Sequence, residues 1–289
     1  MTKPMLLAEF TRLPPASRAC PLDGLSAAID MVAQAAPASH RFLRYQYYAA
    51  ALALHGGAAR TMLVEYDGNA VIALPFVRTG PTAARLAMVP GVDAPFRGFP
   101  AAEDAPDAAF DTLLDALAGE LNVLRIGPIA GDDATFAALR AAAARRGWMA
   151  LDRLMPALVA TDAAGSVCDT QQLLDGAALM AGGFDTLALV DDGPALTFWR
   201  RAAADSVLAA MMSAIVVPRA DRPAAFALHL AGADHVVASG GDAALLEASP
   251  RTAMHEWLLV RPGLPALLGR VLHRLWLRRA VDQAPPASL

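Results

Sequence analysis

Residues 61–77 read TMLVEYDGNAVIALPFV, and they predict the β-hairpin that decides the fold of the first half of the chain. Two apolar runs, Thr61–Tyr66 and Ala70–Val77, flank the triplet Asp67-Gly68-Asn69, whose residues accept the positive φ angles of a tight hairpin turn. A third apolar run at Ala84–Val89 extends this hairpin to a three-stranded meander.

The meander lies between two expected helices, one over Phe42–Leu54 and one that begins near Asp107. The second half repeats this order with a helix at Ala195–Leu208, a strand at Met211–Val217, a turn at Pro218–Arg222, strands at Ala224–Leu230 and His235–Ser239, a Gly-rich loop, and a helix that opens near Ser249-Pro250. We therefore expect an α/β (α+β) protein of two lobes, residues 1–155 and 156–289, with mixed, mostly antiparallel sheets flanked by helices.

Composition limits the classes of function. The chain has 289 residues and a net charge of −4, which argues against the basic face that nucleic-acid binding requires. No apolar run approaches the ~18–20 residues of a membrane-spanning helix, and Met1–Arg12 lacks the apolar core of a secretory signal. Cys20 and Cys168 are too few for a disulfide framework or a multi-cysteine metal site, so we expect a cytoplasmic location.

Periodicity and cap signals assign the remaining segments. We expect an irregular arm at residues 1–20 and, in chain order, a helix at Gly24–Ala36, a helix at Ala108–Leu121, a strand at Asn122–Ile126, a helix from Asp132-Asp133 to Arg145-Arg146, a strand at Leu154–Val159, a helix at Gln171–Met180 and a strand at Phe184–Val190. The segment His255–Arg261 fits either an extension of the helix from Pro250 or a further strand.

A helix, a meander, a loop and a second helix, given twice, resemble the tandem GNAT-like fold of acyl-CoA N-acyltransferases. The chain is most similar in pattern to bacterial GNAT-type proteins associated with cellulose and exopolysaccharide synthesis, which are distant relatives of the Fem peptidyltransferases. The resemblance spans roughly residues 40–260, and it rests on Asp67-Gly68-Asn69-Ala70-Val71-Ile72-Ala73-Leu74-Pro75, Pro90-Gly91-Val92-Asp93-Ala94-Pro95-Phe96-Arg97, Gly147-Trp148, Asp221-Arg222-Pro223-Ala224-Ala225-Phe226-Ala227-Leu228 and Ala248-Ser249-Pro250-Arg251.

The resemblance implies acyl-CoA, with acetyl-CoA as the simplest form, as a co-substrate, and no metal. Its pyrophosphate would bind at a helix N-terminus, where unsatisfied N–H groups and the helix dipole favour an anion. The matching residues are Ser249 as N-cap, Arg251 as a bidentate phosphate ligand, and Thr252. The alternative is that these residues form an ordinary capped helix. The sequence also departs from the family, because the Gln/Arg-x-x-Gly-x-Gly/Ala phosphate loop of typical GNAT enzymes is absent.

The resemblance also implies a base that takes a proton from the acceptor amine beside an edge strand. The edge strand would be His235–Ser239, and the bases available near it in the sequence are His229, Asp234, His235, His255 and Glu256. We take His229 and Glu256 as the catalytic candidates and His235 as a residue that binds the substrate. Each has a plainer interpretation. His229 lies in an apolar strand, where a lone histidine is commonly a hydrogen-bonded core residue, and Glu256, one helical turn beyond Thr252, is equally compatible with a solvated helix face.

Three further residues are candidates for binding the acceptor. Asp93 and Arg97 flank Pro95 in a loop and either pair within that loop or line a cleft between the lobes. Tyr45 begins the aromatic run of the first helix, most of which we expect to pack in the core.

The helix expected at Leu264–Ala280 is amphipathic. Its apolar face carries leucines, and Arg270, Arg274 and Arg278 follow another face. Such a helix either contacts an anionic membrane or a protein partner, or packs its apolar side on the core.

Two classes of function therefore compete. The first is an N-acyltransferase that moves an acyl group from acyl-CoA to an amine of a small metabolite or sugar. The second is a degenerate, non-catalytic GNAT-like protein that binds a partner or polysaccharide in envelope or exopolysaccharide assembly. Aminoacyl transfer from a charged tRNA, as in Fem proteins, is a third class, and the acidic balance makes it the least favoured.

Overall fold

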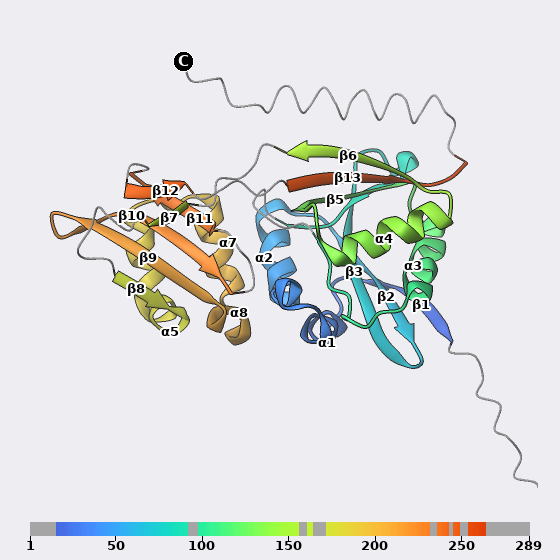
Figure 1. The fold of residues 1–289 in the computed structure, drawn as a ribbon, viewed down its shortest axis with the longest axis horizontal. Coiled ribbons are helices and arrows are strands. Elements are labelled where there is room, and N and C mark those ends of the chain that lie inside the picture. The colour runs from blue at the N-terminus through green and yellow to red at the C-terminus, as the bar shows by residue number, and fades with distance from the viewer. Residues whose placement is uncertain are drawn as a thin grey trace, which may run out of the picture.

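The computed structural model describes residues 16–91, 98–155, 161–163, 172–231, 236–242, 245–248 and 254–263. Over these ranges the chain forms a seven-stranded sheet and a four-stranded sheet, each with helices packed against it, in two adjoining lobes (Figure 1). The short strands β7 (Thr161–Ala163) and β12 (Leu246–Ala248) pair with each other. The predicted α/β (α+β) class with mostly antiparallel sheets is confirmed. The seven-stranded sheet is mixed, since β4 and β5 form the only parallel pair within the described ranges, and the four-stranded sheet is antiparallel.

The N-terminal lobe contains the seven-stranded sheet. Its strands are, in spatial order, β1 (Ser17–Asp23), β2 (Ala59–Tyr66), β3 (Asn69–Thr79), β4 (Leu86–Met88), β5 (Val123–Ala130), β13 (Met254–Val260) and β6 (Met149–Met155). The helices are α1 (Ala28–Ala35), η1 (Ala38–His40), α2 (Tyr45–His55), η2 (Thr82–Ala84), α3 (Asp107–Glu120) and α4 (Ala134–Arg145). Helix α3 packs against β1, β2 and α4, and α1 packs against β3.

The predicted hairpin forms strands β2 and β3. Tyr66 and Asn69 are paired across a two-residue turn, and Asp67 and Gly68 have φ angles of 54° and 81°. Two positive φ angles give the turn the twist that antiparallel strands require. Every residue from Val71 to Val77 is buried, so both faces of β3 are covered, and this strand lies at the centre of the lobe.

Strand β13 lies within the N-terminal sheet although it follows the whole second lobe in the chain. It pairs antiparallel with β5 on one side and with β6 on the other. The prediction that residues 156–289 form the C-terminal lobe is therefore wrong for Met254–Val260. The physical reason is that Trp257 and Leu259 complete the core of the N-terminal lobe, a pairing between residues more than 100 positions apart.

The close approach of β13 to β5 requires a glycine at position 127. A Cβ atom there would lie 2.5 Å from the His255 carbonyl oxygen and 2.9 Å from the Glu256 Cα, and Gly127 has a φ of +107°. The register shifts between His255 and Trp257 at this point. Gly127 thus allows the returning strand to enter the sheet.

The C-terminal lobe contains the four-stranded sheet, ordered β11 (Val236–Gly241), β10 (Arg222–Leu230), β9 (Met212–Arg219) and β8 (Gln172–Asp175). The second meander is confirmed by β9, β10 and β11. The helical segments are α5 (Gly176–Ala178), η3 (Leu179–Gly183), α6 (Phe184–Ala188), α7 (Pro194–Ala202) and α8 (Ser206–Ala210).

Three assignments made from the sequence are wrong. Residues 17–20 belong to β1, Gln172–Asp175 is a strand, and Phe184–Ala188 is a helix. Each is a short segment, in which periodicity does not separate strand, helix and irregular structure. For His255–Arg261, where helix and strand were both open, the structure shows the strand β13. The expected helix at Ala195–Leu208 is interrupted, because the Asp205 side chain accepts hydrogen bonds from the N–H groups of Val207 and Leu208 and starts a second helix.

The two lobes meet where α2 packs against α7 (Figure 1). The Tyr47 ring lies 5.1 Å from the Phe198 ring at 87° and 5.9 Å from the Trp199 ring, and all three side chains are buried. Arg44 Nε donates to Asp205 Oδ2 at 2.7 Å, and Gln46 Nε2 donates to the Arg201 carbonyl at 3.0 Å. Aromatic packing and these polar contacts therefore join the lobes.

Asp205 is held in its charged form at this interface. Burial alone would raise the pKa of the Asp205 carboxyl, but the Arg44 guanidinium and the N–H groups of Val207 and Leu208 outweigh burial and lower the pKa below its usual value. The carboxylate therefore both begins α8 and pairs with the other lobe.

Phe198→Ala removes an aromatic ring from the interface between the lobes. We expect it to lower the free energy of unfolding by about 3–5 kcal/mol, because a large buried ring leaves a cavity. Leu189→Ala is the control, since that side chain is 78% exposed, and we expect a change within about 0.5 kcal/mol. Urea denaturation measures both, and equal effects of the two substitutions would contradict the packing described.

Asp205→Asn tests the charge of the interface. Because the folded pKa is lower than the unfolded value of about 3.9, the stabilisation is fully present above that value and is lost as the pH falls through the folded pKa. The difference in unfolding free energy between wild type and variant should therefore shrink below about pH 4. Urea denaturation from pH 3 to 7 measures it, with the exposed turn substitution Asp221→Asn as control. A difference that does not change with pH would refute the pairing.

Candidate functional site

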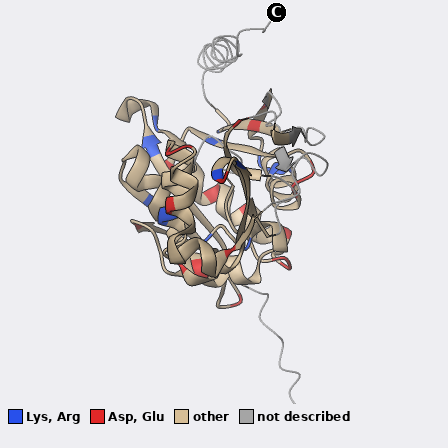
Figure 2. Ribbon diagram, turned by 90° about the vertical axis from the view of Figure 1, so that its left-hand side faces the viewer, with Lys and Arg blue, Asp and Glu red and all other residues tan. Residues whose placement is uncertain are grey.

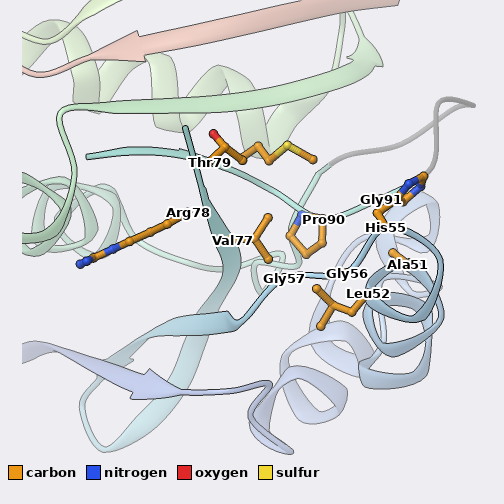
Figure 3. A pocket seen from close by; sticks show the side chains of 11 residues that line it. Ala51, Leu52, His55, Gly56, Gly57, Val77, Arg78, Thr79, Pro90 and Gly91 are labelled. Carbon is orange, nitrogen blue, oxygen red and sulfur yellow. The ribbon is translucent and has the colours of Figure 1, made fainter. Parts of the chain in front are cut away.

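A pocket lies between the C-terminal end of α2 and the C-terminal end of β4, and we call it the α2–β4 pocket (Figure 3). Its volume is about 190 Å³. The residues that line it are Ala51, Leu52, His55, Gly56, Gly57, Val77, Arg78, Thr79, Met88, Pro90 and Gly91.

Local sequence shapes this pocket. Helix α2 ends at His55, and Gly56 follows with a φ of 71° while its N–H donates to the Leu52 carbonyl. Strand β4 pairs with β5 only over Leu86–Met88, with one further bond from the Val89 N–H to the Arg125 carbonyl. Pro90 has no N–H and cannot extend the ladder, so β4 leaves the sheet there. The pocket thus lies outside the carboxyl end of a parallel strand, a common position for ligands.

The lining combines apolar walls with few polar groups. Leu52, Val77 and Met88 form the walls, and Figure 3 shows Val77 beside Pro90 and Leu52 below Pro90. His55 is exposed at the rim, and its side chain makes no hydrogen bond or ion pair with the part of the chain that the structure describes. Arg78 donates to Glu120 at 2.9 Å, so its charge is compensated. His55 is therefore a polar side chain at the rim of the pocket that no described residue holds by a hydrogen bond or an ion pair.

Glu256, predicted as a catalytic base, does not have that role. Its side chain is fully buried on β13, where Arg125 of β5 donates to one carboxylate oxygen and Arg153 of β6 to the other. A carboxylate that is closed to solvent and held by two guanidinium groups is out of reach of a substrate amine. It also lies on a strand, so the expectation that it shares a helical face with Thr252 is wrong.

His229 and Glu256 are not brought together. His229 is half-buried on β10 of the C-terminal sheet, opposite Ser213 of β9 and Val236 of β11, whereas Glu256 belongs to the N-terminal sheet. A catalytic role for His229 stays a prediction, and the structure places it outside the α2–β4 pocket.

Tyr45 is the first residue of α2, at the other end of the helix from His55. Its N–H donates to Asp30 Oδ1 at 2.8 Å, and the residue is 38% exposed. The neighbouring Tyr47 and Tyr48 are buried, as the sequence indicated for most of this run. The Tyr48 hydroxyl donates to the Gly98 carbonyl at 2.9 Å, and burial, followed by the proximity of Tyr47, raises the pKa of Tyr48 well above its ordinary value.

The other predicted site residues lie outside the described residues. These are Asp93, Arg97, His235, Ser249, Arg251 and Thr252, together with the expected helix at residues 264–280. Gly91, which lines the pocket, precedes Asp93 by two positions in the chain. The remainder of that acceptor loop, and the proposed pyrophosphate site, stay predictions.

Sequence reasoning missed His55. The signal that marks it is a histidine at the end of an apolar helix, followed directly by Gly56-Gly57, which turns the chain away and leaves the side chain at an open edge. Pocket residues from β3 and β4 were missed because their proximity to α2 depends on tertiary packing.

Three further features of the described residues bear on function: metal-binding clusters, membrane-spanning helices and the distribution of surface charge. Within the described ranges, no three His, Cys, Asp or Glu side chains gather so as to hold a metal ion. No helix of the described residues is long and apolar enough to cross a membrane. Acidic and basic residues are interspersed over the side of the molecule shown in Figure 2.

Comparison with known proteins gives partial likenesses. No family model matches the chain, and no curated protein sequence is detectably similar. One similar solved structure is that of a conserved protein from Enterococcus faecalis, titled a probable N-acyltransferase, with 10% identity, a TM-score of 0.27 and coverage of 74% of this chain and 55% of that chain. Another is a tandem GNAT protein from the clavulanic acid biosynthesis pathway, without acetyl-CoA, with 14% identity, a TM-score of 0.29 and coverage of 89% and 86%. The chain thus spans about half the length of the Enterococcus protein.

Glu256→Gln tests the structural role of this carboxylate. The substitution keeps the shape but removes the charge that both guanidinium groups contact, so we expect the free energy of unfolding to fall by about 3–5 kcal/mol. Glu65→Gln is the control, because Glu65 is partly exposed and lies 3.8 Å from Arg18, and we expect a loss below about 1 kcal/mol. A Glu256→Gln variant with wild-type stability would contradict the role assigned here.

Proposed function

We propose that the chain is an N-acyltransferase that moves an acyl group from acyl-CoA, with acetyl-CoA as the simplest donor, to an amine of a small metabolite or sugar. The observation that carries the proposal is the α2–β4 pocket, which has apolar walls and, at its rim, an imidazole that none of the described residues pairs with. A cytoplasmic location fits this reaction. Acyl-CoA would supply the activated acyl thioester.

The size of the pocket fits the reacting end of the donor. Pockets that enclose a drug-sized ligand have volumes of about 300–1,000 Å³, whereas this one has about 190 Å³. It therefore suits a short acyl chain and not a whole nucleotide. The pyrophosphate would bind elsewhere, and Ser249, Arg251 and Thr252 stay the proposed residues for it.

The residues of the pocket have distinct roles in this proposal. Leu52, Val77 and Met88 exclude water from the acyl chain. His55 takes the proton of the acceptor amine, a task suited to imidazole at neutral pH. Asp93 and Arg97 are proposed to bind the acceptor, because their loop follows Gly91 at the pocket.

A non-catalytic protein that binds a partner or polysaccharide in envelope or exopolysaccharide assembly is the second candidate. The observation that favours it concerns the edge of β3 beyond β4. The Ala73 N–H donates to the Pro100 carbonyl at 3.2 Å, and the Ala102 N–H donates to the Val71 carbonyl at 2.8 Å, while Phe99 is buried. Residues 99–102 therefore occupy the edge of β3 beyond β4. A ligand cannot bind along that edge, and this favours a non-catalytic protein.

Thermal unfolding with saturating acetyl-CoA, hexanoyl-CoA and free CoA tests the proposal. We expect the acyl-CoAs to raise the melting temperature more than free CoA does, because they bind the native state. Leu52→Phe narrows the pocket and should abolish this extra shift, whereas Leu189→Phe, at an exposed position outside the pocket, should preserve it. If none of the three compounds raised the melting temperature, the acyltransferase proposal would be contradicted and the non-catalytic binding protein would be favoured.

His55→Gln separates binding from chemistry. We expect it to keep the thermal shift with acetyl-CoA but to slow acetylation of small amines and amino sugars by about 10²-fold or more, since a positioned base contributes that much. Release of free CoA thiol measures the rate. His255→Gln is the matched control, because His255 contacts Asp152 on the sheet and does not line the pocket. An equal loss of rate in both variants would rule out His55 as the base.

A further inference from the structure

A second cavity lies in the groove between the two lobes, and we call it the interlobe groove. Its volume is about 470 Å³. The N-terminal lobe supplies one wall from α1, η1 and the start of α2, and the C-terminal lobe supplies the other from α8 and the end of β10. The lining residues are Gln34, Ala38, Arg41, Arg44, Val207, Met211 and Ala231.

Two arginines line this groove, and they differ in whether a carboxylate pairs with the guanidinium group. Arg44 pairs with Asp205 at 2.7 Å and with Asp30 at 3.4 Å, so its charge is balanced by two carboxylates. Arg41 is exposed, and its Nε donates to the Ala36 carbonyl at 3.3 Å. Within the described residues no carboxylate pairs with Arg41. The groove therefore presents the guanidinium group of Arg41, whose charge no carboxylate of the described ranges compensates.

The opposite wall of the groove is apolar. Val207 is 47% exposed although it is a large aliphatic residue, and it lies beside the partly buried Met211. Ala231 and Ala38 have small side chains and leave the groove open between the lobes. The Ala231 N–H donates to the Met211 carbonyl at 2.7 Å, so the backbone of this wall is already satisfied and fixed.

We propose that the interlobe groove binds a small aliphatic carboxylate, with its carboxylate on the terminal guanidinium nitrogens of Arg41 and its chain against Val207 and Met211. A guanidinium group matches the two oxygens of a carboxylate in a planar, bidentate arrangement. A single such group beside an apolar wall suits a singly charged head with an alkyl tail. A phosphate group, with more oxygens to satisfy, would need further donors.

This site is separate from the α2–β4 pocket. The interlobe groove lies at the Arg44 end of α2 and the pocket at the His55 end, with the 11 residues of the helix between them. At a rise of about 1.5 Å per residue the two ends are roughly 16 Å apart. A short carboxylate therefore cannot occupy both, and the proposal stands independently of the acyltransferase.

Isothermal titration of the full chain with sodium hexanoate tests the site. We expect saturable binding at one site, no binding of hexylamine, and binding of 1-hexanol that is about tenfold or more weaker, because only the carboxylate pairs with Arg41. Hexyl phosphate is titrated in the same way to compare the two head groups. If it bound more tightly than hexanoate, the assignment of the groove to a carboxylate head group would be overturned. Absence of hexanoate binding would overturn the proposal.

Variants locate the binding. Arg41→Gln should weaken hexanoate binding about tenfold or more, and Arg18→Gln, which changes an exposed arginine on β1, should leave it unchanged. Ala231→Leu fills the groove from the other lobe and should also weaken binding, so the test does not depend on one variant. Thermal unfolding without ligand confirms that each variant is folded. Equal hexanoate affinity in wild type, Arg41→Gln and Ala231→Leu would place the carboxylate elsewhere.

Discussion

The packing of α2 against α7 is the contact on which the rest of the structure depends. Tyr47 of one lobe lies edge-on to Phe198 of the other, and Arg44 pairs with Asp205 beside them. Helix α2 has a cavity at each end, and this contact fixes the shape of the interlobe groove, whose walls come from both lobes. A change in the angle between the lobes would alter the groove directly, whereas every residue that lines the α2–β4 pocket belongs to the N-terminal lobe.

The return of β13 into the first sheet is the second constraint. Because β13 follows the second lobe in the chain and yet belongs to the sheet of the first, the N-terminal lobe is built from two separate stretches of chain. Its carboxylate Glu256 contacts Arg153 on one neighbouring strand and Arg125 on the other. The charged groups thus specify the register of three strands, and Gly127 allows the backbones to approach. The Glu256 carboxylate therefore has a structural role, since it links β13 to both neighbouring strands.

The sequence predicted what depends on local chemistry. The turn at Asp67-Gly68 was found because it needs positive φ angles, and both meanders followed from apolar runs between turn residues. Partners separated by more than 100 residues leave no local signal, so the placement of β13 was wrong and Glu256 was mistaken for a base. His55 was missed although Gly56-Gly57 marks the helix end beside it, since the strands that form its pocket come near it only after folding. The predicted pyrophosphate site lies outside the described residues and stays a prediction.

The α2–α7 contact and the returning strand β13 make the two lobes one cooperative unit. Differential scanning calorimetry of the full chain tests this cooperativity most directly. We expect a single transition whose van't Hoff enthalpy equals its calorimetric enthalpy. Two resolved transitions, or a van't Hoff enthalpy well below the calorimetric one, would show that the lobes unfold separately and would contradict it.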